Sequence, residues 1–149
     1  MPGVNQVRVL RLPNNPDLPL PSRRTSGSAG FDLASAESDF VLAPGERRLV
    51  STGLAIELPP GVEGQVRPRS GLALRYGLTM PNAPGTIDSD YRGELKVILQ
   101  NSGAEPVGIA RGDRIAQVVF VRYETPVLVD ATELEASARG PGGFGSTGV

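Results

Sequence analysis

The sequence predicts an all-β fold, a distorted jelly roll or β-barrel-like single domain with one short helix. Short apolar runs alternate with turn residues, and the 149-residue chain holds 19 glycines and 14 prolines spread along its length. Many short strands separated by such turn signals are typical of sandwiches, barrels and jelly rolls. The length suits one domain, residues 1–149, that can bury a sizeable core.

The expected strands follow one another at short intervals. In the run 94–100, Leu95, Val97 and Leu99 alternate with polar or less apolar residues, which is a strand pattern. Turn residues lie at 43–45, 59–61, 101–103 and 111–113. The predicted strands are 7–12, 31–34, 40–42, 47–51, 54–58, 63–68, 79–80, 94–100, 106–109, 113–122 and 127–129.

One short helix is predicted at residues 71–76. Ser70 stands where an N-cap belongs, and Gly77 where a helix commonly stops. Two segments do not fit a compact core: residues 13–29 are polar and proline-rich and predict an extended connection, and residues 139–149 form a glycine-rich arm. We expect that arm to be a mobile flap, because it has too few apolar side chains to offset its ordering entropy.

Composition excludes several functions. A formal net charge of −1 gives no basic field for nucleic acid, and no apolar run is long enough to cross a membrane. The N-terminus lacks a secretory signal, so a cytoplasmic location is expected. Cysteine and histidine are absent, which excludes thiol nucleophiles, disulfides, a Ser-His-Asp triad and the common zinc sites. Catalysis must use carboxylates, hydroxyls, arginines or backbone amides, and any metal should be a hard cation such as Mg²⁺.

Residues 85–93 carry the densest group of candidate side chains. Asp88 and Asp90 lie two residues apart beside Tyr91, in a turn bounded by Gly85 and Gly93 and followed by the 94–100 strand. A hairpin that holds an acid on rigid strands can position a general base. Asp also favours turns for local reasons, so this segment alone allows a structural interpretation.

Three further segments offer polar groups for an anion or a cation. Arg69 precedes Ser70 and Gly71, which could offer amides at a helix start or serve as a plain cap. Asp32 interrupts an apolar strand and could serve a bound cation or hold an arginine. Gln117 interrupts another and could bind a ligand. Internal hydrogen bonding is the alternative for both residues.

The arm matches a dinucleotide fingerprint at Gly140, Gly142 and Gly145, but too little chain follows for a strand–helix–strand unit. We interpret it as a flap. Its polar groups and glycine amides suit phosphate, and Phe144 suits stacking on a flat ring. A disordered end with an incidental phenylalanine is the alternative.

Taken together, five segments in this order resemble the motifs of the homotrimeric dUTPase family: residues 29–33, 68–72, 82–93, 112–117 and 139–148. The third is a specific match by itself. The resemblance covers the chain from residue 29 to its C-terminus.

The resemblance implies a jelly-roll homotrimer with active sites shared between subunits. It implies hydrolysis of dUTP to dUMP and pyrophosphate with Mg²⁺ on the triphosphate, which keeps uracil out of DNA and supplies dUMP for thymidylate synthesis. Asp88 is then the general base for water attack on the α-phosphorus, while Asp90 belongs to the hairpin structure. Tyr91 packs on the deoxyribose and leaves no room for a 2′-hydroxyl.

The remaining implied roles concern uracil, the phosphates and the metal. Asp32 reaches Mg²⁺ only through water. The uracil edge is read by Asn82 with the backbone at Thr86, Ile87 and Lys96. The phosphates are held by Arg69, Ser70, Gly71 and Gln117. The arm of a third subunit supplies Phe144 for stacking and Arg139, Gly145, Ser146 and Thr147 near the terminal phosphate.

Two rival functions stay open at this stage. A dCTP deaminase shares the fold and works without zinc, but it needs a catalytic Glu in the hairpin region, where this chain has Asp88. A dUTPase-like trimer that binds nucleotide without hydrolysing it is the non-enzymatic alternative. The intact Asp88, Tyr91 and Phe144 argue against it.

Overall fold

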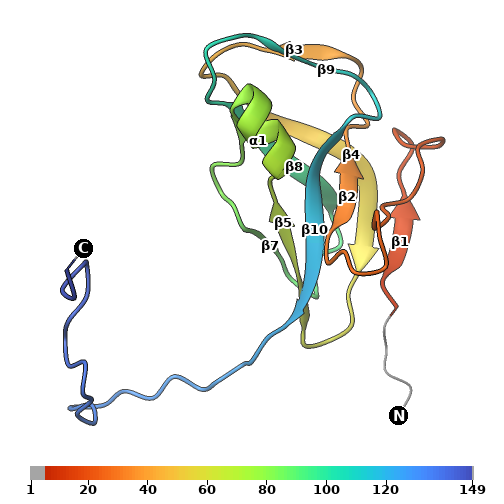
Figure 1. Ribbon diagram of the computed structural model, residues 1–149. Helices are drawn as coiled ribbons and strands as arrows, with labels where there is room; N and C mark the ends of the chain where they lie inside the picture. The colour runs from red at the N-terminus through yellow and green to blue at the C-terminus, as the bar shows by residue number, and fades with distance from the viewer. Residues whose placement is uncertain (1–5, 149) are drawn as a thin grey trace.

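The computed structural model describes residues 6–148 and confirms the all-β prediction (Figure 1). Three antiparallel sheets contain all the strands of this part of the chain, and a single short helix accompanies them. The strands are β1 (Arg8–Arg11), β2 (Phe31–Ala34), β3 (Phe40–Leu42), β4 (Arg47–Glu57), β5 (Val62–Arg67), β6 (Leu78–Thr79), β7 (Gly85–Ile87), β8 (Glu94–Asn101), β9 (Val107–Ile109) and β10 (Arg114–Arg122).

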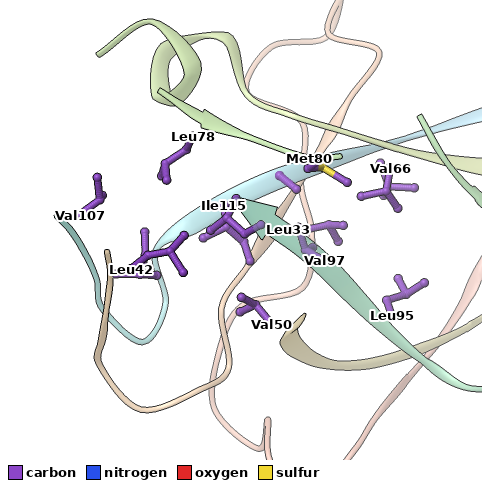
Figure 2. Close-up of a cluster of buried hydrophobic side chains, with 14 of the residues drawn as sticks. Leu33, Leu42, Val50, Val66, Leu78, Met80, Leu95, Val97, Val107 and Ile115 are labelled. Carbon is purple, nitrogen blue, oxygen red and sulfur yellow. The ribbon is translucent and has the colours of Figure 1, made fainter. Parts of the chain in front are cut away.

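The sheets are two of four strands, ordered β1-β4-β8-β6 and β2-β10-β5-β7, and a two-stranded ribbon of β3 and β9. Their inward side chains form one apolar cluster (Figure 2). Val50 and Val97 come from the first sheet, Leu33 and Val66 from the second, and Leu42 from the ribbon. The alternation in β8 puts Leu95, Val97 and Leu99 in this core, as the sequence pattern predicts.

The helix α1 (Ser70–Tyr76) begins one residue earlier than predicted. Arg69 occupies the N-cap position in an extended conformation, and no side chain caps the helix, so the assignment of the cap to Ser70 was wrong. Gly77 ends the helix in the left-handed region at φ 69°, as predicted. A side chain there would also meet the backbone of Gly103, so the position has room only for glycine.

Three other strand predictions need correction. Residues 47–51 and 54–58 form one strand, β4, whose pairing with β8 shifts register between Ser51 and Ala55. Strand β7 was missed because the prediction treated residues 85–93 as one turn. Residues 127–129 form no strand; Leu128 is 94% exposed. Their high β-propensity has no effect here, since they pair with no strand in residues 6–148.

Residues 13–29 connect β1 to β2 through turns and bends rather than a fully extended path. From Tyr123 onward the described chain contains no helix or strand and runs away from the sheets (Figure 1). No helix in residues 6–148 is long and apolar enough to cross a membrane.

Candidate active site

A polar cleft of about 390 Å³ lies where β2, β10 and the end of β5 meet the start of α1. The pairing register explains the gathering, because Gln117 of β10 stands opposite Asp32 on one side and opposite Arg67 on the other. The cleft therefore collects Asp32, Arg69, Ser70, Gly71 and Gln117, all predicted as phosphate or metal residues.

Asp32 is the one acidic side chain in the described lining of this cleft, and arginines surround it. Its carboxylate lies 3.0 Å from Arg114 Nη1, 3.4 Å from Arg69 Nε and 3.6 Å from Arg24 Nε. The sequence left open whether Asp32 serves a bound cation or pairs with an arginine, and the structure shows it paired with arginines. With Arg67 also lining the cleft, positive charge exceeds negative charge, which suits phosphate.

Gln117 is fixed by two close neighbours. Its Nε2 donates to the carbonyl of Pro68 at 3.0 Å, directly before Arg69. A Cβ built on Gly30 would stand 2.1 Å from Gln117 Oε1, so only glycine leaves room for this side-chain position. The arrangement holds the Pro68–Arg69 backbone against β10 and fills part of Gln117's hydrogen-bonding capacity internally.

The second group of predicted residues lies on residues 82–96, which we call the β7–β8 segment. The hairpin predicted here was wrong, because β7 pairs with β5 while β8 pairs with β4 and β6, so the two strands belong to different sheets. Asp88 directly follows β7 and is exposed, and its carboxylate has no ion pair within residues 6–148. The amide of Tyr91 donates to the carbonyl of Asp88 at 3.1 Å, which closes the turn. The Asn82 side chain lies beside the start of β7, because its Nδ2 would be 3.1 Å from a Cβ built on Gly85.

Tyr91 is anchored across the turn. Its hydroxyl donates to the carbonyl of Glu94 at 2.9 Å. A Cβ on Gly93 would meet the Tyr91 ring and hydroxyl at under 3 Å, so glycine at 93 is what lets the ring lie there. Thr86 and Ile87 belong to β7, which pairs with β5, and Lys96 belongs to β8, which pairs with β4, so a neighbouring strand holds the backbone of each.

Glu94, at the start of β8, is a carboxylate that the sequence did not single out. Partial burial raises its pKa, but hydrogen bonds from Asn14 and Gly53 and the charge of Lys96 outweigh burial and hold the pKa below the usual 4.5. A lowered folded-state pKa means that ionised Glu94 stabilises the fold above about pH 4.5 and that this contribution is lost as pH falls through the folded-state pKa.

We therefore expect the stability of Glu94→Gln to depend less on pH at acidic pH than the stability of the wild type does. The difference in melting temperature between wild type and Glu94→Gln should shrink from pH 7 to pH 3.5, because protonated Glu94 loses its advantage over Gln. Thermal unfolding at both pH values measures this. A difference that stays constant with pH would contradict the assignment.

The arm residues Arg139, Phe144, Gly145, Ser146 and Thr147 lie apart from both groups. Their hydrogen bonds are local, such as Arg139 Nε to the carbonyl of Gly142 at 2.8 Å. The Phe144 side chain is fully exposed. Figure 1 shows this segment at the far end of the chain's course, away from the sheets.

The cleft and Asp88 do not meet within one chain. Strand β7 pairs with β5 from Val66 to Gly64, so it runs away from Arg67 and the cleft. From the level of Arg67 to that of Gly64 is about 10 Å at roughly 3.3 Å per residue, and Asp88 continues in the same direction. One chain therefore presents the cleft and Asp88 on separate parts of its surface.

Comparison with known proteins decides the family. The family profile described as dUTPase matches residues 17–148. The chain is 59% identical over 146 residues to the deoxyuridine 5′-triphosphate nucleotidohydrolase of Methylocella silvestris, covering 96% of this chain and 91% of that one. The chain belongs to the dUTPase family. A second family member, from an Anaeromyxobacter species, is 60% identical over 143 residues, covering 95% and 97% of the two chains.

Solved structures of dUTPases share the fold. The dUTPase of Staphylococcus bacteriophage 80alpha with dUpNHpp superimposes with a TM-score of 0.88 at 31% identity, covering 97% of this chain and 99% of that one. A mutant dUTPase of phage phi11 of S. aureus, described with a structural Mg(II) ion, gives 0.78 at 28% identity, covering 89% and 100%. These neighbours support the jelly-roll prediction.

Several residues of the cleft were missed by the sequence analysis. Arg24 and Arg114 pair with Asp32 yet come from a connection and from the start of β10. Gly30 was noted only as part of a motif, although it makes the space for Gln117. The position of Arg114 at the start of an apolar strand was the available signal, but its partner depends on strand register, which no local pattern gives.

Proposed function

We propose that this dUTPase-family protein hydrolyses dUTP to dUMP and pyrophosphate within one catalytic domain spanning residues 1–149. The observation that carries the proposal is the pair of half-sites: an arginine-rich cleft for phosphates, and the β7–β8 segment, which presents an exposed carboxylate beside a tyrosine. The nucleotidohydrolase names of relatives about 60% identical, and the nucleotide analogue held by the phage 80alpha dUTPase, support the substrate.

Asp88 is the general base in this proposal. Its carboxylate orients a water and takes its proton as the water oxygen bonds to the α-phosphorus. The bond from that phosphorus to the α,β-bridging oxygen breaks in line, and its electron pair leaves with pyrophosphate. The exposed position of Asp88, free of ion pairs in the described chain, keeps the carboxylate available for this proton.

The β7–β8 segment recognises the nucleoside in this proposal. Asn82 and the backbone of Thr86, Ile87 and Lys96 pair with the uracil edge, because fixed amides and carbonyls match uracil and oppose the reversed pattern of cytosine. Tyr91 packs on the deoxyribose and excludes a 2′-hydroxyl. Its anchor to the carbonyl of Glu94 supports this role, since a ring that excludes one atom must be held in place.

The phosphates bind in the cleft through Arg69, Ser70, Gly71 and Gln117. Mg²⁺ is proposed to arrive on the triphosphate, where it neutralises charge. Within residues 6–148 no three acidic side chains gather to form a metal cage. Asp32 already faces three arginines. Because these arginines already pair with its oxygens, Asp32 is proposed to contact Mg²⁺ only through a water of the ion, which commonly keeps several waters beside substrate phosphates.

A homotrimer would join the two halves. The separation of Asp88 from the cleft within one chain supports active sites built between subunits. The exposed apolar residues Val127, Leu128 and Val129 also support assembly, because contiguous exposed apolar surface commonly marks an interface.

The arm, residues 139–149, acts as a mobile flap in this proposal. Phe144 stacks on uracil while Arg139, Gly145, Ser146 and Thr147 approach the terminal phosphate.

Mixing two inactive variants tests the shared site. Arg69→Ala disables the cleft and Asp88→Asn disables the β7–β8 segment, so each homotrimer should be nearly inactive. Co-expression of the two, followed by isolation of mixed trimers, should restore a measurable part of wild-type activity, because some sites combine an intact cleft with an intact β7–β8 segment. Mixed trimers no more active than the parents would place both halves of each site in one chain.

The reaction itself is tested by pyrophosphate release with Mg²⁺ from dUTP, dCTP, dTTP and UTP, side by side. Release from dUTP alone is expected. Deaminated product from dCTP would favour the dCTP deaminase alternative. No reaction with any of the four nucleotides would favour a binding protein.

We further propose that the enzyme works in the cytoplasm, where it keeps uracil out of DNA and supplies dUMP for thymidylate synthesis.

A further inference from the structure

The start of β8 lies against a bulge in β4. Ser51 pairs with Lys96 and Ala55 with Glu94, so four steps along β4 correspond to two along β8. The extra residues, including Thr52 and Gly53, cannot use the regular ladder for all their polar groups. Other parts of the chain must therefore satisfy them.

The connection of residues 13–29, together with Leu12 just before it, satisfies two of these groups. Asn15, only 2% exposed, donates from Nδ2 to the carbonyl of Thr52 at 2.8 Å. The amide of Leu12, just before the connection, donates to the carbonyl of Gly53 at 2.9 Å. Gly53 has φ 65°, and a Cβ there would stand 2.3 Å from Asn15 Cβ, so the close approach needs glycine.

Glu94 accepts from the amide of Gly53 and joins the connection to the β7–β8 segment. Its Oε1 accepts from the amide of Gly53 at 2.8 Å and from Asn14 Nδ2 at 3.0 Å. The Glu94 side chain is 16% exposed, so these bonds are partly shielded from water. Asn14, Asn15, Thr52, Gly53 and Glu94 together form what we call the bulge network.

The same residue anchors Tyr91, because the Tyr91 hydroxyl donates to the Glu94 carbonyl at 2.9 Å. The Glu94 side chain fixes the backbone on which the tyrosine rests. Lys96 Nζ approaches the other carboxylate oxygen at 3.7 Å, on the strand that follows. The network thus runs from the connection through Glu94 to the tyrosine without a gap.

We propose that Glu94 and Asn14 are positioning residues that set the place of the Tyr91 ring and thereby the discrimination between deoxyribose and ribose. The inference rests on the proposed function and gives the connection a role beyond joining two strands. Rejection of one hydroxyl depends on a narrow gap, and a displacement of about 1 Å can change rates by roughly a hundredfold. Neither side chain needs to touch the nucleotide.

The test measures kcat and KM for dUTP and UTP with purified full-length variants. Glu94→Ala removes both side-chain bonds and should lower the ratio of kcat/KM for dUTP over UTP about tenfold, a modest share of what a steric pocket provides. Asn14→Ala leaves the Gly53 bond and should lower the ratio about threefold. Glu94→Gln keeps an acceptor oxygen and should stay within about twofold of wild type.

Asp17→Ala is the matched control. Asp17 lies in the same connection and pairs with Arg111 at 2.7 Å, but it makes no contact with Glu94. Its loss should leave the dUTP-to-UTP ratio unchanged even if stability falls. A purely structural role for Glu94 would lower activity on both nucleotides in proportion, so the ratio separates positioning from stability.

The outcomes also separate the inference from the proposed function. A wild-type enzyme that does not prefer dUTP over UTP would overturn the Tyr91 role and, with it, the inference. A selective wild type whose Asn14→Ala and Glu94→Ala variants keep the full ratio would overturn the inference alone. Asn14→Ala keeps the test decisive should Glu94→Ala fail to fold, since the Asn14 side chain is exposed and its removal leaves Gly53 paired.

Discussion

Asp88→Asn should lower the turnover of dUTP by about 10²- to 10⁴-fold while leaving its dissociation constant within a few-fold of wild type. Asparagine keeps the shape of the side chain and the turn closed by the Tyr91 amide, but it cannot accept a proton from water. Single-turnover kinetics and equilibrium binding of dUTP measure the two quantities separately. The effect should lie in the chemical step, because neither the cleft nor the uracil-reading backbone changes.

Asp90→Asn is the matched control for this prediction. Asp90 is an exposed carboxylate in the same turn, two residues from Asp88. We assign Asp90 to the structure of this turn and not to catalysis, so its substitution should leave turnover within a few-fold of wild type. Near-normal turnover of Asp88→Asn, or a larger loss for Asp90→Asn, would move the base to another residue and refute the assignment.

Deleting residues 139–149 should leave a folded protein whose activity on dUTP falls by at least about a hundredfold. The described arm residues bond only to one another and to Ser137 just before them, so their removal costs little stability. Activity depends on them because a closing flap excludes water and holds the substrate in a reactive position. Circular dichroism, sedimentation and steady-state kinetics on the truncated protein measure fold, assembly and activity.

Phe144→Ala refines the deletion, because it removes the stacking ring and keeps the glycine backbone. Phe144→Ala should raise KM for dUTP and show part of the activity loss of the truncated protein, in line with the roughly 1–3 kcal/mol that a base–aromatic stack contributes. A truncated protein that fails to fold or assemble would show a structural arm. A truncated protein with full activity would show that the arm takes no part in catalysis.

Local sequence signals were sufficient for most of the fold. Regular alternation placed β8, and glycine in the left-handed region ended α1 at Gly77. Two of the failures share one cause, which is that strand formation depends on a partner. Residues 127–129 have strand propensity but no partner strand in residues 6–148, while Gly85–Ile87 pairs with β5 despite its turn-like composition.

The site was predictable as a list of residues but not as an arrangement. Motif positions led to Asp32, Arg69 and Gln117, and the structure gathers them in one cleft. The arginines around Asp32 and the contact between Asn14 and Glu94 depend on register across residues far apart in the chain. No local pattern encodes such pairings, and the separation of Asp88 from the cleft likewise emerged only from the order of strands.

The most direct test of the proposed reaction is hydrolysis of dUTP in ¹⁸O-labelled water by the wild-type protein with Mg²⁺. Attack of water on the α-phosphorus puts the label in dUMP and leaves pyrophosphate unlabelled, and this is the result we expect. Label in pyrophosphate would mean attack at the β-phosphorus, and release of labelled inorganic phosphate with dUDP would mean attack at the γ-phosphorus. Either of those results would contradict the proposed reaction.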